Sequence, residues 1–166
     1  MLEKVSSFKP VFDSTSTILM LGTMPSPKSR EVGFYYSHPQ NRFWRIMAEL
    51  FQTDVPASTD DKTRLMLENR IALWDVLAAC MIKNAEDSSI KEAEYNNFSI
   101  IFSVADIRAV FTTGKKAFDL YSKHNASKTH PPIYLPSTSP ANCRLPYAEI
   151  AESYRRILSF TNRYHS

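Results

Sequence analysis

The chain has 166 residues but only two cysteines, Cys80 and Cys143. Two cysteines are too few for a disulfide framework, and they are too few for a four-cysteine iron–sulfur cluster held by this chain alone. The sequence also lacks the CxxC and HExxH spacings that are typical of zinc sites. We therefore expect a protein without a metal site and without a cofactor.

Long apolar runs are missing as well. No run reaches the roughly 20 residues that a membrane-spanning helix needs. The first residues, Met1 to Val5, lack the basic and then apolar pattern of a secretory signal. These absences predict a protein of the cytoplasm that has no membrane contact, and we expect it to be a monomer.

The composition is that of an ordinary globular protein, with 43% hydrophobic and 22% charged residues. The length fits one domain over residues 1–166, and no repeat or linker divides it. A net charge of +3 neither requires nor excludes a nucleic-acid partner. Basic residues recur near the motifs described below, where they are either DNA contacts or ordinary solvated charges: Lys28, Arg30, Arg42, Arg45, Lys115, Lys116 and Arg144.

Short apolar runs alternate with segments of helical spacing, a pattern that predicts an α/β fold with a mostly parallel sheet. Expected strands are 17–21, 71–76, 107–112 and 132–135. Expected helices are 41–52, 58–67, 114–121 and one that starts at Pro146 and reaches Leu158, while the segment after Val76 is either a helix or a loop. Because ligands bind beyond the carboxyl ends of parallel strands, the loops after these strands are expected to share one site.

Three motifs lie in such loops or directly after them. LGTMPS (21–26) follows the first strand, YYSHPQNRFW (35–44) comes soon afterwards, and LPSTSPAN (135–142) ends the last strand. Together they resemble the uracil-DNA glycosylase superfamily, and the resemblance runs from Ile18 to Ile157. With LWDVLAAC (73–80), the motifs look most similar to the hypoxanthine-DNA glycosylase branch of that superfamily.

The resemblance implies a three-layer α/β/α sandwich with a central four-stranded sheet. It also implies a monofunctional enzyme that flips a deaminated base out of DNA and hydrolyses its N-glycosidic bond. Such an enzyme has to stabilise positive charge on the sugar and negative charge on the departing base. Its partner is DNA that contains a deaminated base, with hypoxanthine as the first choice.

Asn41 is the expected catalytic residue, because the resemblance gives the asparagine of HPxNxFW the key role. Its alternative role is to cap the helix that begins there. Tyr36 matches an aromatic residue that stacks on the base, although core packing is the common fate of such a ring. Met24 stands where better-known branches have a water-directing Asn or Asp, which argues against strong uracil activity or, alternatively, against catalysis.

Other base-binding candidates are Gly22, Thr23 and two polar residues with ordinary structural alternatives. His38 is a donor to a base or a phosphate, or else a structural residue before Pro39. Asp75 touches the base or water, or else forms a turn at the end of a strand. In relatives with a histidine in the terminal loop, the matching position here holds Leu135, so that the resemblance implies no such donor.

The two Pro/Ser loops supply the expected DNA contacts, since hydroxyls and backbone amides in tight turns suit phosphates. The alternative is a plain turn. The candidate DNA-binding residues are Pro25, Ser26, Pro136, Ser137, Thr138, Ser139, Ala141, Asn142 and Arg144, of which Ala141, Asn142 and Arg144 are candidates to fill the gap left by the flipped base. A lyase role for Lys115 or Lys116 is not favoured, since both residues fit an ordinary helix surface.

Three rival functions remain open at this point. One is a uracil or mismatch-specific glycosylase. Another is a non-catalytic nucleic-acid-binding protein with the same fold. The third is a hydrolase that acts on free nucleosides.

Overall fold

The computed structural model describes residues 1–84, 86–142 and 144–161. At its centre is a four-stranded parallel sheet with the strand order β3-β2-β6-β7. Its strands are β2 (Ile18–Gly22), β3 (Ile71–Asp75), β6 (Ala109–Thr113) and β7 (Pro132–Leu135). The predicted parallel sheet is therefore confirmed, and its strand bounds lie within two residues of the expected ones.

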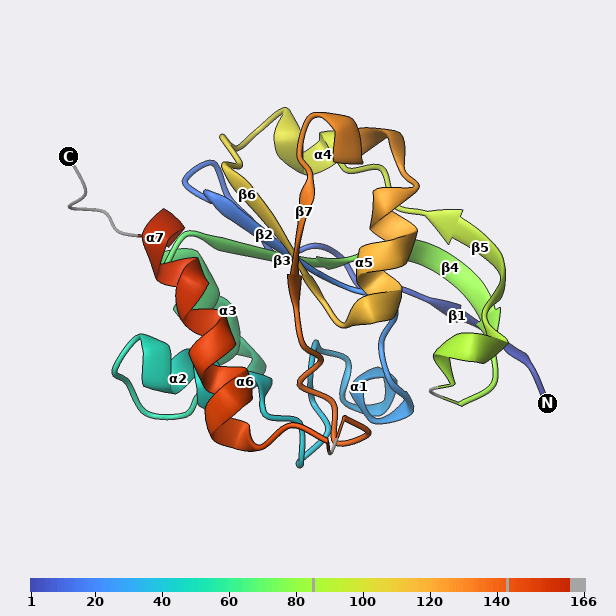
Figure 1. Ribbon diagram of the computed structural model, residues 1–166, viewed down its shortest axis with the longest axis horizontal. Helices are drawn as coiled ribbons and strands as arrows, with labels where there is room; N and C mark the ends of the chain where they lie inside the picture. The colour runs from blue at the N-terminus through green and yellow to red at the C-terminus, as the bar shows by residue number, and fades with distance from the viewer. Residues whose placement is uncertain (85, 143, 162–166) are drawn as a thin grey trace.

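Helices cover both faces of this sheet. In Figure 1, α2, α3 and α6 lie on one side of it and α5 lies on the other. The α-helices are α1 (Pro27–Val32), α2 (Phe43–Leu50), α3 (Thr59–Glu68), α4 (Ser99–Phe102), α5 (Lys115–Ser122), α6 (Tyr147–Tyr154) and α7 (Leu158–Thr161). The fold is the α/β/α arrangement that the sequence predicts.

The core follows from the apolar strands and from one face of each covering helix. All five residues of β2 are buried, and so are all five of β3, as expected for strands that are covered on both faces. On α2, Phe43, Ile46 and Met47 are fully buried at helical spacing. The predicted last helix is interrupted, because a 3-10 turn at Arg155–Ile157 separates α6 from α7.

A second sheet was not predicted. It is antiparallel, with the order β1-β4-β5, and its strands are β1 (Glu3–Ser6), β4 (Leu77–Ile82) and β5 (Lys91–Tyr95). The segment after Val76 is thus a strand, which corrects the expectation of a helix or a loop. Leu77–Ile82 pairs with β1 on one side and with β5 on the other, and its buried residues do not alternate along the strand, so its sequence lacks the period of two that marks a half-buried strand.

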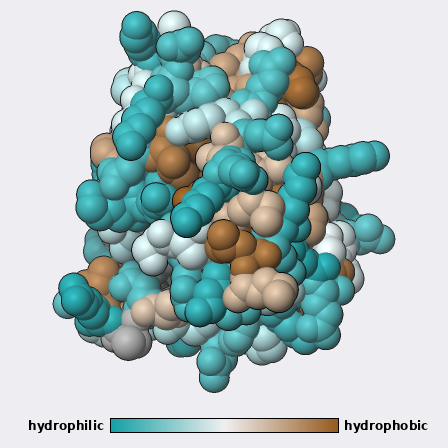
Figure 2. All heavy atoms as spheres, turned by 90° about the vertical axis from the view of Figure 1, so that its right-hand side faces the viewer, coloured by the Kyte–Doolittle hydropathy of each residue, from teal (hydrophilic) through white to brown (hydrophobic). Residues whose placement is uncertain are grey.

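The surface beside this second sheet is largely polar. β5 exposes four of its five residues, and Figure 2 shows a mostly hydrophilic face with small, separate hydrophobic patches. Helix α1 was also missed, although Ser26 caps it, Pro27 is its first residue and Gly33 ends it with a φ of 88°. Serine, proline and glycine in these places are the standard signals of a short helix.

Within the described ranges, no helix is both long and apolar enough to cross a membrane. No cluster of three or more potential metal ligands occurs among the same residues. Cys80 is a buried free thiol, whereas Cys143 lies outside the described residues.

Candidate functional site

A cleft of about 910 Å³ opens at the carboxyl ends of the parallel strands. The loops after β2, β6 and β7 contribute to its walls together with Asp75, the last residue of β3, as the strand order predicts. Fourteen of the predicted site residues line this cleft: Gly22, Thr23, Met24, Pro25, Ser26, Tyr36, His38, Asn41, Asp75, Ser137, Thr138, Ser139, Ala141 and Asn142.

The floor of the cleft is formed where β2 and β3 end side by side. Gly22 pairs with Asp75 in the sheet register. A Cβ atom on residue 22 would lie 2.9 Å from Oδ1 of Asp75 and 3.4 Å from the hydroxyl of Tyr36. Glycine is therefore required at position 22, because it lets the carboxyl group and the phenol approach the backbone from two sides.

Asp75 is a buried acid that forms no ion pair with any described residue. Its side chain is 4% exposed, and Oδ2 is buried without a hydrogen-bond partner among the described residues. The Asn96 amide donates to the backbone oxygen of Asp75 at 2.8 Å. Burial raises the pKa of the Asp75 carboxyl to about 7, because the low-dielectric surroundings disfavour its charged form.

Tyr36 is held in an unusual conformation beside this floor. Its φ of 53° lies in the left-handed region, which is uncommon for a bulky residue. Its ring stacks on Phe43 at a centroid distance of 3.9 Å and an interplanar angle of 13°. One face of the ring is therefore used by the core, and the residue also lines the cleft.

A chain of hydrogen bonds fixes the Tyr36 hydroxyl. Thr113 donates its hydroxyl proton to the carbonyl of Leu21 at 3.3 Å, so the 3.1 Å contact between Tyr36 and Thr113 is one in which the phenol donates. Burial raises the pKa of Tyr36 far above its ordinary value. The phenol is therefore a neutral donor that is already used within the protein.

Asn41 lies one residue before the N-cap of α2, which is Arg42 and makes no side-chain capping bond. The Oδ1 atom of Asn41 accepts the backbone N–H of Phe43, the first residue of α2, at 2.9 Å. The residue also lines the cleft, and its NH₂ group donates to none of the described residues. This bond to Phe43 holds the carboxamide in place, and the amide donor stays available to a ligand.

His38 and Met24 complete the wall near Asn41. Nδ1 of His38 accepts the backbone N–H of Gln40 at 3.0 Å, so the proton of a neutral ring is on Nε2. Met24 packs against the core from the cleft side. A thioether accepts hydrogen bonds only weakly, so position 24 supplies apolar contact.

Arg42 organises the Pro/Ser loop, a role that the sequence did not assign to it. Its guanidinium donates to the backbone oxygens of Ser139 at 2.9 Å and Asn142 at 2.8 Å, and it reaches those of Leu145 at 3.2 Å and Thr138 at 3.4 Å. Its backbone N–H donates to Thr138 as well. The NRFW motif therefore joins the Asn41 segment to the Pro/Ser loop.

The Pro/Ser loop uses several of its own side chains internally. Ser137 Oγ accepts the N–H of Ser139 at 3.1 Å, and the Asn142 amide donates to the Ser137 carbonyl at 2.9 Å. Asn142 is therefore a poor filler for the gap left by a flipped base, while Ala141 is exposed on the cleft rim.

Two predicted DNA contacts do not line the cleft. Pro136 is buried, and its carbonyl accepts the Tyr154 hydroxyl at 2.7 Å. Arg144 is exposed beyond the loop. Ser26 does line the cleft, but its hydroxyl accepts the Ser29 N–H and caps α1.

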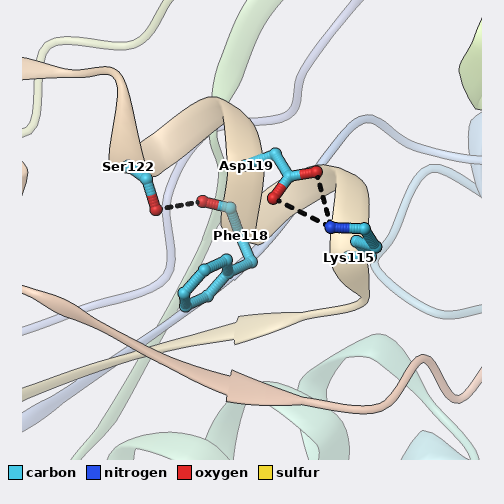
Figure 3. Close-up of polar contacts among 4 residues, drawn as sticks. All are labelled: Lys115, Phe118, Asp119 and Ser122. Carbon is cyan, nitrogen blue, oxygen red and sulfur yellow. Dashed lines mark hydrogen bonds and ion pairs between the residues drawn. The ribbon is translucent and has the colours of Figure 1, made fainter.

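Lys115 lies on the rim at the start of α5. Its side chain is 81% exposed and forms an ion pair with Asp119 one turn further along the helix, at 3.2 Å. Figure 3 shows this pair, together with the hydroxyl of Ser122, which bonds to the Phe118 carbonyl. The placement is that of a surface lysine and gives no support to a Schiff-base role.

Sequence reasoning missed Arg42, Thr113 and Phe43 as parts of the site. Arg42 stood out only as one of several basic residues, and its four carbonyl partners lie about a hundred positions away in the chain. Thr113 ends β6 next to the floor. Its place at a strand end was the one signal that pointed to it.

The comparisons with known proteins agree with this geometry. The family model of the uracil DNA glycosylase superfamily matches residues 9–156. A hypoxanthine DNA glycosylase of Methanosarcina barkeri is 35% identical over 69% of this chain and 73% of its own length. A hypoxanthine DNA glycosylase of Methanosarcina acetivorans is 33% identical over 82% of this chain and 87% of its own.

A solved structure is similar as well. It is the solution NMR structure of a Methanosarcina acetivorans protein assigned to the uracil DNA glycosylases. It has 29% sequence identity and a TM-score of 0.79, and the match covers 94% of this chain and 99% of that one. The fold and the family match together define a glycosylase of DNA bases. The chain belongs to the uracil DNA glycosylase superfamily, as its motifs predict.

Proposed function

We propose that this protein releases hypoxanthine from DNA by flipping the nucleotide into the cleft and hydrolysing its N-glycosidic bond. The observation that carries the proposal is the pairing of Asn41 and Met24 in one cleft. An amide donor is held ready on one segment, while the position that directs water in other branches holds a thioether. The two hypoxanthine DNA glycosylases at 33% and 35% identity support the choice of base.

In this mechanism the named residues bind the flipped nucleotide and the departing base, and none of them activates the attacking water. Tyr36 offers an aromatic surface to the extruded base, and the Asn41 amide donates to a base that gains negative charge as it leaves. The Pro/Ser loop and the first Pro/Ser turn contact phosphates on either side of the flipped nucleotide. We further propose that residues 1–166 act as one domain, as a monomer, in the cytoplasm.

The test is base release from a duplex with a single hypoxanthine, compared with release from free inosine, for wild type and Asn41→Ala. We expect wild type to release hypoxanthine from the duplex but not from free inosine, and we expect Asn41→Ala to lose the release from the duplex. Release from inosine would identify a nucleoside hydrolase. Tight duplex binding without any release would identify a non-catalytic binding protein.

A further inference from the structure

Asp75 is the one buried charge-bearing group in the described part of the cleft that the mechanism above does not use. Neither of its carboxylate oxygens accepts a hydrogen bond from a described residue, and Oδ2 is fully buried. A side chain so placed needs either a ligand or a proton, because an unpaired buried carboxylate is costly. Oδ1 lies against Gly22 on the cleft floor, so a base that enters the cleft meets this carboxyl group.

The surroundings of Asp75 favour the neutral acid. The groups that face it from neighbouring segments are the phenols of Tyr35 and Tyr36, and no described cation forms an ion pair with it. The other titratable residues that line the cleft are Lys28, Glu31, His38, Asp87 and Lys115. Burial alone raises the pKa of Asp75 to about 7.

The negative charge on a departing base also favours a neutral Asp75. As the C1′–N9 bond breaks, its electron pair moves to the base, and an ionised carboxylate at the floor would repel the resulting anion. A neutral carboxyl group instead offers a donor to it. Purines carry an acceptor nitrogen at N7, whereas pyrimidines have no equivalent ring nitrogen.

We propose that Asp75 enters the reaction as a neutral carboxylic acid and transfers its proton to N7 of the departing purine. This inference rests on the proposed function and deepens it, because it makes a purine the preferred class of base. The C1′–N9 bond breaks, its electron pair stays on the base, and the proton from Asp75 neutralises that base. Water adds to C1′ and loses one proton, which restores the acid, so that atoms and charges balance.

The first test is the pH profile of single-turnover hypoxanthine release, from about pH 5.5 to about pH 9. Wild type should be fastest at low pH and should fall by about tenfold per pH unit above the pKa of Asp75. Asp75→Asn keeps a donor but has no transferable proton, so it should be about a hundredfold slower and should lack this descending limb. A wild-type rate that rises with pH would show an ionised base acting on water and would overturn the proposal.

His38 provides the matched control. His38→Asn should keep the descending limb, and Asp75→Asn should lose it. If Asp75→Asn kept the limb, or matched the wild-type rate, the proton donor would be another group and the proposal would be wrong.

The second test does not need catalysis. Binding at about pH 6 is compared for duplexes that contain hypoxanthine or 7-deazahypoxanthine, in which a carbon replaces N7. Wild type should bind the deaza duplex more weakly, and Asp75→Ala should bind both equally. Equal binding by wild type would overturn the N7 contact. An absence of base release at every pH would instead contradict the proposed function. The binding comparison would still test whether Asp75 contacts N7.

Discussion

Asn41 and Asp75 are placed in the cleft for different reasons. The carboxamide of Asn41 is fixed by the backbone N–H that it accepts at the start of α2, whereas Asp75 is fixed by its place at the end of a buried strand. Among the described residues, the NH₂ group of Asn41 donates to none, and Oδ2 of Asp75 has no hydrogen-bond partner. Each can therefore be tested by a substitution that removes one property and retains the other.

Replacing Asn41 separates its structural role from catalysis. Asn41→Ala removes both the acceptor of the Phe43 N–H and the amide donor, while Asn41→Ser keeps a hydroxyl that can accept this N–H. We expect base release to fall about a hundredfold or more in both variants, because a donor to the transition state is lost. Thermal unfolding should show a lower Tm for Asn41→Ala than for Asn41→Ser. A serine variant with nearly normal release would leave Asn41 with the structural role only.

Burial of Asp75 should appear in the pH dependence of stability. Its pKa is about 7 in the folded protein, against an ordinary value of 3.8. Between these two pH values the unfolded chain loses its proton first, so the free energy of unfolding falls as the pH rises. The loss is complete above pH 7, and it amounts to roughly a few kcal/mol at most.

Asp75→Asn replaces the titrating carboxyl group by an amide of nearly the same shape, which does not titrate. We expect the variant to be about as stable as wild type near pH 4 and more stable than wild type near pH 8. Urea unfolding of both proteins at the two pH values measures the difference and cancels the other titrating groups. The same pH dependence in both proteins would show that Asp75 is ionised without cost.

At the scale of elements, the Pro/Ser loop depends on a residue from another motif. Arg42 precedes α2 and donates to four carbonyls of the loop region. Hydrogen bonds from a charged donor contribute about 1.5–3 kcal/mol each, and these also decide which loop amides and hydroxyls face the cleft. The loop is therefore built by the NRFW segment as much as by its own prolines and serines.

Arg42→Met should loosen this loop. We expect weaker binding to damaged and undamaged duplexes alike, since phosphate contacts carry no base identity, together with a lower Tm. Arg108→Met is the matched control, because it removes the same charge from an exposed residue directly before β6, at the opposite end of the strands from the cleft. The account of Arg42 fails if both variants bind a duplex equally well, or if only hypoxanthine recognition is lost.

The elements also show what the sequence could and could not predict. Strands such as 18–22 and 71–75 were predictable, because continuous apolar runs between turn residues mark buried strands. β4 was not, because its buried residues do not alternate along the strand. In the site, motif residues were found from their loops, whereas Arg42 and Thr113 act through contacts that only the folded chain creates.

For the molecule as a whole, the parallel sheet brings three loops and the end of β3 to one edge, where they form a large cleft. Overall charge does little to select a base, since the net charge is only +3 and the cleft rim carries both Lys28 and Glu31. Selectivity for the base must then come from the residues of the cleft floor and walls. We expect Met24 and Asp75 to distinguish a purine from a pyrimidine.

The most direct measurement is the single-turnover rate of base release by wild type from two matched duplexes, one with hypoxanthine and one with uracil. Hypoxanthine should be released much faster than uracil, because position 24 lacks a water-directing amide and a pyrimidine has no N7 for Asp75. Uracil released as fast as hypoxanthine would show that Met24 and Asp75 do not select a purine, and it would favour a mismatch-specific glycosylase.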